Sequence, residues 1–148
     1  MSDIATYEEL MPWDLPGSSI LAEEPDDFLY QPPYDLEERT AKMGESIIEF
    51  CKKVPLGPRT DRLVNQLTGC GTSVGANYCE ADDAVSLKEF VHIIGICRKE
   101  ARETKFFLRM IAKARPELRD QARFLWSEAN ELHLIFSKIR RTTLAKIK

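Results

Sequence analysis

The sequence predicts an all-α protein: an up-down-up-down antiparallel four-helix bundle that follows an irregular acidic N-terminal extension. Two observations lead to this prediction. Four segments repeat apolar residues at spacings that alternate between three and four, and the connections between these segments are short. The spacing keeps each apolar set on one side of a helix, and short connections make consecutive helices antiparallel neighbours. We therefore divide the chain into an extension over residues 1–34 and a bundle over residues 35–148.

The first two helices are delimited by their caps and by the prolines between them. The first is expected from Asp35, a suitable N-cap, to Val54, because Pro55 follows the last turn. The second is expected from Thr60 to Asp82. The first apolar stripe comprises Leu36, Thr40, Met43, Ile47, Phe50 and Val54. The second comprises Leu63, Leu67, Cys70, Val74, Asn77 and Ala81.

Glycines crowd the centre of the second helix, at Gly69, Gly71 and Gly75. Each costs up to about 1 kcal/mol of helix propensity relative to alanine, so a compensating contact is needed. A phosphate-binding loop is the alternative, but residues 69–75 lack the Gly-Lys-Ser/Thr ending and no strand precedes them. We therefore expect another helix to approach closely over these small residues.

The third helix opens with a capping box, Ser86 and Glu89, and is expected to reach Lys113. The fourth is expected from Pro116, which suits a first helical position, to Thr143. The third stripe comprises Phe90, Ile94, Cys97, Ala101, Thr104, Leu108 and Ile111. The fourth comprises Leu118, Ala122, Leu125, Ala129, Leu132, Phe136 and Ile139.

Charge is distributed unevenly along the chain. Residues 1–35 contain nine Asp and Glu and no Lys or Arg, so a net charge of −3 for the whole chain leaves +6 on residues 36–148. No charged and apolar leader typical of a signal peptide opens the sequence, and no apolar run approaches the roughly 18 residues of a membrane span. We therefore expect a cytoplasmic protein that has no membrane partner.

The acidic extension contains five prolines within residues 1–34, which exclude a continuous helix. It can be read as a disordered, solvating segment. It can also be read as a segment that docks on a basic or apolar surface, because large apolar side chains lie among its carboxylates. The docking candidates are Trp13, Phe28 and Tyr30.

No catalytic, metal-binding or cofactor-binding cluster is recognisable, and we do not expect an enzyme. The two histidines, His92 and His133, have no other ligand at metal-binding spacing. The four cysteines form no CxxC pair and are expected to be small buried apolar residues. They are Cys51, Cys70, Cys79 and Cys97.

Basic residues form a ridge along the third helix, spaced four, three and four, and the fourth helix ends in further basic residues. This ridge can be an ordinary solvated face, with pairs such as Lys99 and Glu103, or a surface that contacts phosphates or a neighbouring subunit that carries carboxylates. The candidates for nucleic-acid binding are Arg98, Arg102, Lys105, Arg109, Arg140 and Arg141.

Large apolar residues also lie outside the predicted core. Ile96, Phe106 and Met110 share a further face of the third helix, which suggests a subunit interface. Trp126 lies on a mostly polar face of the fourth helix, where it could be half-buried at the bundle edge or anchor an interface or a nucleic-acid base.

Three segments carry a family resemblance: residues 35–50, residues 71–81 and residues 94–105. Together they resemble the four-helix-bundle proteins encoded in intervening sequences of bacterial 23S rRNA genes, over about residues 35–142. The resemblance implies a bundle that assembles into a ring-shaped homopentamer. It also implies distant kinship with the accessory protein of diversity-generating retroelements, a basic pentamer that binds nucleic acid and a reverse transcriptase. The acidic extension lies outside the family pattern.

These observations favour a non-enzymatic oligomeric scaffold. Its basic surface would bind RNA or an RNA-associated protein, and the acidic extension would mask that surface or dock a partner. The alternative is a protein-interaction module with no nucleic-acid binding. We expect no cofactor in either case.

Overall fold

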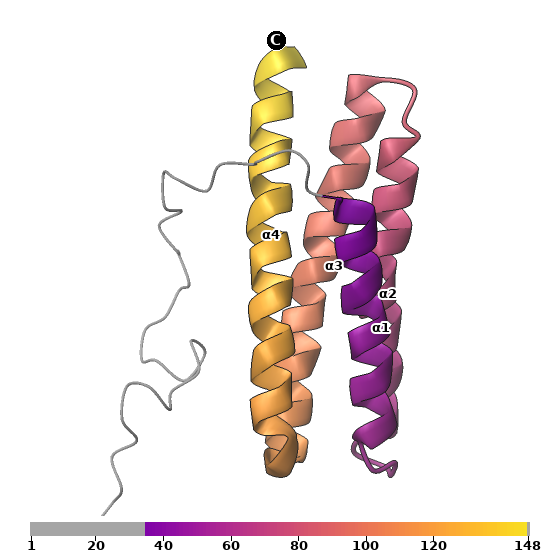
Figure 1. Ribbon diagram of the computed structural model, residues 1–148, viewed down its shortest axis with the longest axis vertical. Helices are drawn as coiled ribbons and strands as arrows, with labels where there is room; N and C mark the ends of the chain where they lie inside the picture. Colours follow the sequence, from indigo (N-terminus) through magenta and orange to yellow (C-terminus); the bar gives the residue numbers. More distant parts are fainter. Residues whose placement is uncertain (1–34, 148) are drawn as a thin grey trace, which may run out of the picture.

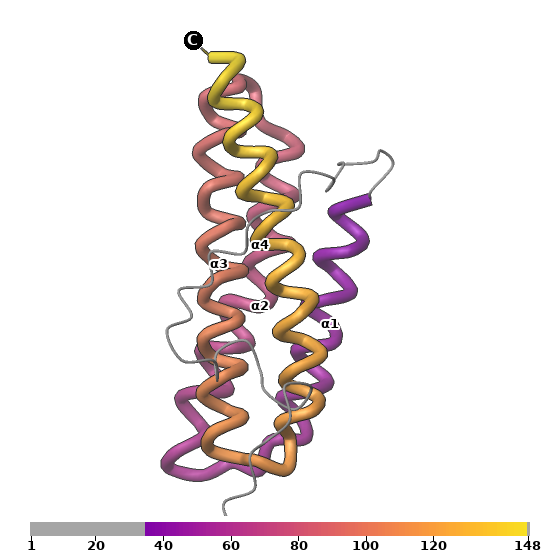
Figure 2. The backbone as a smooth tube through the Cα atoms, turned by 90° about the vertical axis from the view of Figure 1, so that its left-hand side faces the viewer, coloured from indigo at the N-terminus to yellow at the C-terminus, as the bar shows by residue number. Residues whose placement is uncertain are grey.

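The computed structural model describes residues 35–147, and it confirms the all-α prediction for this part of the chain. The helices are α1 (Leu36–Lys53), α2 (Asp61–Asp82), α3 (Leu87–Ala114) and α4 (Arg119–Ile147), with a short 3-10 helix η2 (Pro116–Leu118) before α4. They run alternately up and down side by side (Figures 1 and 2). The predictions for residues 1–34, including the docking candidates Trp13, Phe28 and Tyr30, lie outside the described residues.

Local capping explains why the predicted helix ends are close to the observed ones. The Asp35 carboxylate accepts a hydrogen bond from the Glu38 amide at 3.0 Å, and the Ser86 hydroxyl accepts one from the Glu89 amide at 3.1 Å. The Glu89 carboxylate in turn accepts from the Val85 amide at 2.9 Å. These side chains satisfy backbone donors that have no partner inside the helix. The main difference lies in α4, which continues to Ile147.

The four predicted stripes meet in one core. Nearly all of their residues are buried, and the exceptions are half-buried: Leu63, Asn77, Phe90 and Ile139. The polar members are satisfied within their own helices. The Thr40 hydroxyl donates to the Leu36 carbonyl at 2.7 Å, and the Asn77 amide donates to the Ser73 carbonyl at 2.8 Å. Polar residues therefore occupy the stripes without unpaired hydrogen-bonding groups.

The glycines of α2 allow α1 to approach closely, as expected, at two of three positions. A Cβ atom at Gly71 would lie 2.9 Å from Ile47 Cγ2, and one at Gly75 would lie 3.0 Å from Thr40 Oγ1. At Gly69 a Cβ atom would meet nothing within 4 Å, so close packing does not explain that glycine. The tight contact between α1 and α2 is made largely by side chains of α1.

Three of the four cysteines are buried as predicted, and the prediction is wrong for Cys79, which is exposed. Cys79 falls between the stripe positions 77 and 81, so it points away from the core. Burial raises the pKa of the Cys70 thiol to about 11 and that of the Cys97 thiol to about 12. These two thiols are therefore protonated and unreactive at neutral pH.

The bundle is uneven because α1 has 18 residues whereas α3 has 28 and α4 has 29. The turn between α2 and α3 and the end of α4 project beyond the first residue of α1 (Figures 1 and 2). Within the described residues, no helix is both long enough and apolar enough to cross a membrane.

Candidate functional site

The antiparallel packing of α3 on α4 joins two polar surfaces that the sequence presented separately. The Lys105 ammonium donates to the Asn130 side-chain carbonyl at 3.0 Å, and a Cβ atom on Gly95 would lie 3.6 Å from Arg140 Nε. These two contacts define the register of the helix pair. We call this surface the α3–α4 seam; it comprises Gly95, Arg98, Arg102, Lys105 and Arg109 of α3 and Asn130, His133, Ser137 and Arg140 of α4.

Lys105 is held in place from two sides. Besides its bond to Asn130, its ammonium lies 5.3 Å from the centre of the Trp126 ring, within reach of a cation–π interaction. Burial lowers the pKa of Lys105 to about 8, and the neighbouring Arg102 lowers it further. The ammonium is therefore fixed in position, but its protonated form is less stable than that of an ordinary surface lysine.

His133 lies among the cations of α3 and is neutral at pH 7. Burial lowers its pKa to about 4, and Lys105, Arg98 and Arg102 each add to the effect. Its Nε2 atom is buried without a hydrogen-bond partner, and so is Nε of Arg98. A buried polar atom without a partner is unfavourable, so two unsatisfied groups in one seam call for an explanation.

The cations of the seam are not neutralised by the carboxylates of their own helix. Glu100 and Glu103 lie on the α2 side of α3. Burial is the main cause of the raised pKa of Cys70, and these two carboxylates are close enough to raise it further. Within the described residues, no carboxylate forms an ion pair with any arginine or lysine of the seam, and the pair Lys99 and Glu103 is also not formed. The seam therefore presents positive charge that no described residue compensates.

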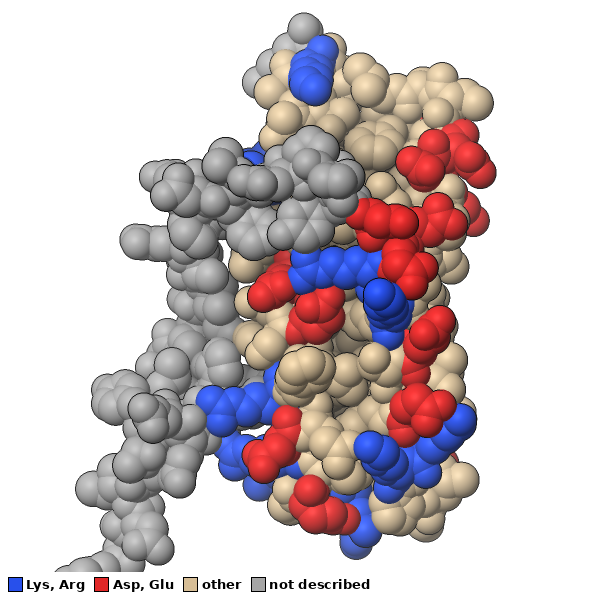
Figure 3. All heavy atoms as spheres, in the orientation of Figure 1, with Lys and Arg blue, Asp and Glu red and all other residues tan. Residues whose placement is uncertain are grey.

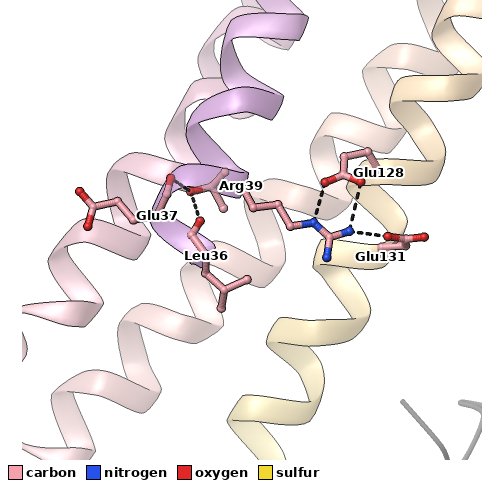
Figure 4. Close-up of polar contacts among 6 residues, drawn as sticks. Leu36, Glu37, Arg39, Glu128 and Glu131 are labelled. Atoms are coloured by element: carbon pink, nitrogen blue, oxygen red, sulfur yellow. Dashed lines mark hydrogen bonds and ion pairs between the residues drawn. The ribbon is translucent and has the colours of Figure 1, made fainter. Parts of the chain in front are cut away.

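The other side of α4 shows the opposite arrangement (Figure 4). Arg39 of α1 donates to both oxygens of Glu128, through Nε at 2.8 Å and Nη2 at 3.1 Å, and also contacts Glu131. On the face drawn in Figure 3, acidic and basic side chains likewise lie next to one another. The Arg39 contacts are salt bridges that were not predicted, because their partners lie 89 and 92 residues apart in sequence.

A groove of about 600 Å³ also lies between α1 and α4. Its lining combines apolar and acidic side chains, and the Phe124 side chain there is 76% exposed. The groove was not predicted, because Phe124 lies off the apolar stripe of α4. Its main lining residues are Glu45, Glu49, Phe50, Asp120, Phe124 and Leu125.

The predicted interface residues are placed differently from one another. Phe106 is 53% exposed and packs edge-on against Phe107, with ring centres 5.2 Å apart. Ile96 and Met110 are half-buried. Trp126 is buried more deeply than either alternative expected for it: it is 6% exposed, because the core-facing side of α4 is wider than the stripe and Lys105 lies over its ring. It therefore offers no surface for a base or a neighbouring subunit.

The remaining candidates extend the positive surface along α4. Arg140 is half-buried over Gly95, and Arg141 is exposed beside it. Among residues 35–147, no group of three or more His, Cys, Asp or Glu side chains is arranged to hold a metal ion.

Comparison with known proteins agrees with this architecture. Residues 34–138 match the sequence profile of a family described as 23S rRNA-intervening sequence protein. A protein of unknown function from the S23 ribosomal protein family of Bacteroides thetaiotaomicron has a similar crystal structure, with a TM-score of 0.65 and 24% sequence identity. The similarity covers 71% of this chain and 97% of that one. None of the curated proteins matches the chain. Because the profile spans most of the chain, the protein belongs to the family of 23S rRNA-intervening sequence proteins.

Proposed function

We propose that the protein is a non-enzymatic oligomeric scaffold that binds RNA through the α3–α4 seam. The observation that supports this most is the charge of the seam: no described carboxylate pairs with its four arginines or with Lys105. Unneutralised cations on a protein surface attract polyanions and release condensed counterions when they contact phosphates. The family name adds an association with rRNA genes.

The spacing of the cations suits a chain of phosphates. Arg98 and Arg109 are separated by three turns of α3, which is about 16 Å along the helix axis. Contacts over that length would fix the position of an RNA backbone without reading its sequence. Trp126 is buried, so base stacking on this ring does not contribute.

The test is RNA binding at several salt concentrations, measured by fluorescence anisotropy with a labelled single-stranded RNA. Arg102→Gln should weaken binding and reduce the slope of log affinity against log salt by about 1. The matched control is Arg62→Gln, an exposed arginine at the start of α2, which should leave affinity and slope unchanged. Equal binding by both variants, or no salt dependence, would contradict RNA binding at the seam.

We propose further that the scaffold is a homo-oligomer, a homopentamer, with Phe106 in its subunit interface. Phe106 is the one residue of the predicted interface set that exposes more than half of its side chain. Phe106→Glu should therefore reduce the molar mass measured by light scattering while the helical circular dichroism is retained. Phe124→Glu is the matched control, because Phe124 is still more exposed but lies on α4. A wild-type protein that is monomeric at tens of micromolar would overturn this part.

The alternative function is a protein-interaction module. It is favoured by the groove between α1 and α4, whose exposed Phe124 lies beside the acidic residues Glu49 and Asp120. In that case the binding partner would be a protein, and added salt would weaken binding only slightly.

A further inference from the structure

The middle of the seam contains buried hydrogen-bonding atoms without partners, which positive charge alone does not explain. Arg98 Nε and His133 Nε2 are both buried without partners, although each can donate a hydrogen bond. The contacts of Lys105 with Asn130 and of Gly95 with Arg140 fix the helix register. That register places His133 opposite Arg102, one helical turn from Arg98. Two donors without partners, one from each helix, therefore lie in the same part of the seam.

The neighbouring groups are already used elsewhere. The Ser137 hydroxyl donates to the His133 carbonyl at 2.8 Å, and the Asn130 carbonyl accepts from Lys105. The acidic residues Glu128 and Glu131 of α4 are bound to Arg39 on the other side of the helix. No described side chain accepts a hydrogen bond from Arg98 Nε, and an anion from outside would supply an acceptor.

We propose that the region between Arg98 and His133 is a preformed site for one phosphate group, and that its occupation is coupled to proton uptake by the protein. This proposal rests on the proposed function, because it names the part of the seam that binds phosphate most specifically. A tetrahedral oxyanion can accept several charge-assisted hydrogen bonds at once. An arginine donor from α3 and a neutral histidine donor from α4 would provide such bonds.

The proton coupling follows from the groups that surround the site. Those facing Lys105 and His133 are the arginines Arg98 and Arg102 of α3, with Arg109 and Arg140 at the two ends of the seam. Burial is the largest cause of both low pKa values; Arg102 adds to it at both residues, and Lys105 and Arg98 add to it at His133. A bound anion has the opposite effect and raises both pKa values. At pH 8, where Lys105 is only partly protonated, binding must draw a proton from solution.

The experiment uses the full chain and sulfate as the first probe, since sulfate is a tetrahedral dianion that does not itself titrate near neutral pH. Calorimetry in two buffers of different ionisation enthalpy measures the protons taken up on binding. We expect up to about half a proton at pH 8 and almost none at pH 6.5, because Lys105 is then already protonated. Inorganic phosphate should compete with sulfate for the same site.

A second measurement locates the site by histidine ring NMR. The chain has two histidines, and the exposed His92, six residues before Arg98 on α3, serves as an internal control. Phosphate should raise the pKa of His133 by about 1 unit or more and leave the titration of His92 unchanged. Arg98→Gln should abolish this shift, whereas Arg109→Gln, at the end of the seam, should retain most of it. Arg98→Lys keeps the charge but loses the Nε donor, so it should retain only part of the shift.

The outcomes separate this proposal from the proposed function. If RNA binds through the seam but phosphate leaves His133 unchanged, the surface is diffuse and the proposed site is wrong. If phosphate shifts His133 but RNA does not bind, the site stands and the RNA scaffold is wrong. Equal losses in Arg98→Gln and Arg109→Gln would also overturn a single site. A phosphate effect without proton uptake at pH 8 would overturn the coupling.

Discussion

Helix α4 has charged side chains at two junctions, and they are arranged in opposite ways. At the α1 junction, Glu128 and Glu131 neutralise Arg39 through close hydrogen bonds. At the α3 junction, cations lie beside the neutral His133 with no described counter-charge. The first arrangement joins a short helix to the bundle. The second is unfavourable for folding, and long apolar stripes on α3 and α4 must hold it together.

Charge pairing and apolar packing therefore substitute for each other along α4. Helix α1 has 18 residues and faces α4 across the groove that contains Phe124. Helices α3 and α4 share a buried core that includes Leu108, Ile111 and Phe136. We therefore expect paired charges to matter for stability at α1 and unpaired charges to matter for binding at α3.

The largest effect is expected at Arg39. Arg39→Met removes both salt bridges and leaves Glu128 and Glu131 near each other without a counter-charge. Because the Arg39 side chain is 20% exposed, we expect a loss of about 2–3 kcal/mol in the free energy of unfolding, measured with urea. Lys42→Met is the matched control: its pair with Glu38 spans 3.8 Å at an exposed site, and its loss should cost less than about 0.5 kcal/mol. Similar losses in both variants would remove the distinction between the two kinds of pair.

The next effect concerns the acidic extension and the seam. Residues 1–35 carry nine carboxylates, so a tethered extension should compete with RNA for the seam at high effective concentration. Deleting residues 1–34 should tighten RNA binding about tenfold at low salt, and the difference should shrink as salt screens the charges. If the truncated and full-length proteins bind RNA equally, the extension does not mask the seam and is better read as a docking segment for another protein.

The pH dependence of stability tests the environment of His133 in the seam when wild type is compared with a variant that lacks this group. The pKa of His133 is about 4 in the folded protein and should return to about 6.5 when the chain unfolds, so the unfolded state binds the proton first. Stability should therefore fall as the pH drops from 6.5 through 4, and His133→Gln should reduce this fall by about 1 kcal/mol. Thermal unfolding followed by circular dichroism at pH 7, 5.5 and 4.5 provides the comparison. A constant difference between the two proteins at all three values would mean that His133 does not titrate abnormally.

The smallest effect has the opposite sign to that at Arg39. Arg102 lowers the pKa values of Lys105 and His133, so Arg102→Gln should relieve repulsion and raise the free energy of unfolding by up to about 0.5 kcal/mol. The exposed Arg109 is not among the causes of either shift, and Arg109→Gln should be neutral. A loss of more than about 1 kcal/mol in Arg102→Gln would mean that the seam is a structural contact.

The elements were predictable because the signals that define them are local. Ser86 and Glu89 lie three residues apart, and the four stripes depend only on helical periodicity. The spacing of the seam cations along α3 could also be read from the sequence. Their relation to His133 and Asn130 was not, because it depends on the register of two helices. The burial of Trp126 was not predictable for the same reason. The pattern of α4 alone does not show that Lys105 of α3 covers the Trp126 ring.

The exposure of Cys79 has a practical consequence. The other three cysteines are buried, and two have thiols with strongly raised pKa values. A maleimide or spin label added to the native chain should therefore attach at Cys79 alone, without any engineered mutation. Partial desolvation and the nearby Glu37 raise the pKa of this thiol, so a mildly alkaline buffer is needed. Glu37 belongs to the first turn of α1, where residues 1–34 join the bundle. The protein thus carries a natural attachment point for a spectroscopic probe at the base of its acidic extension.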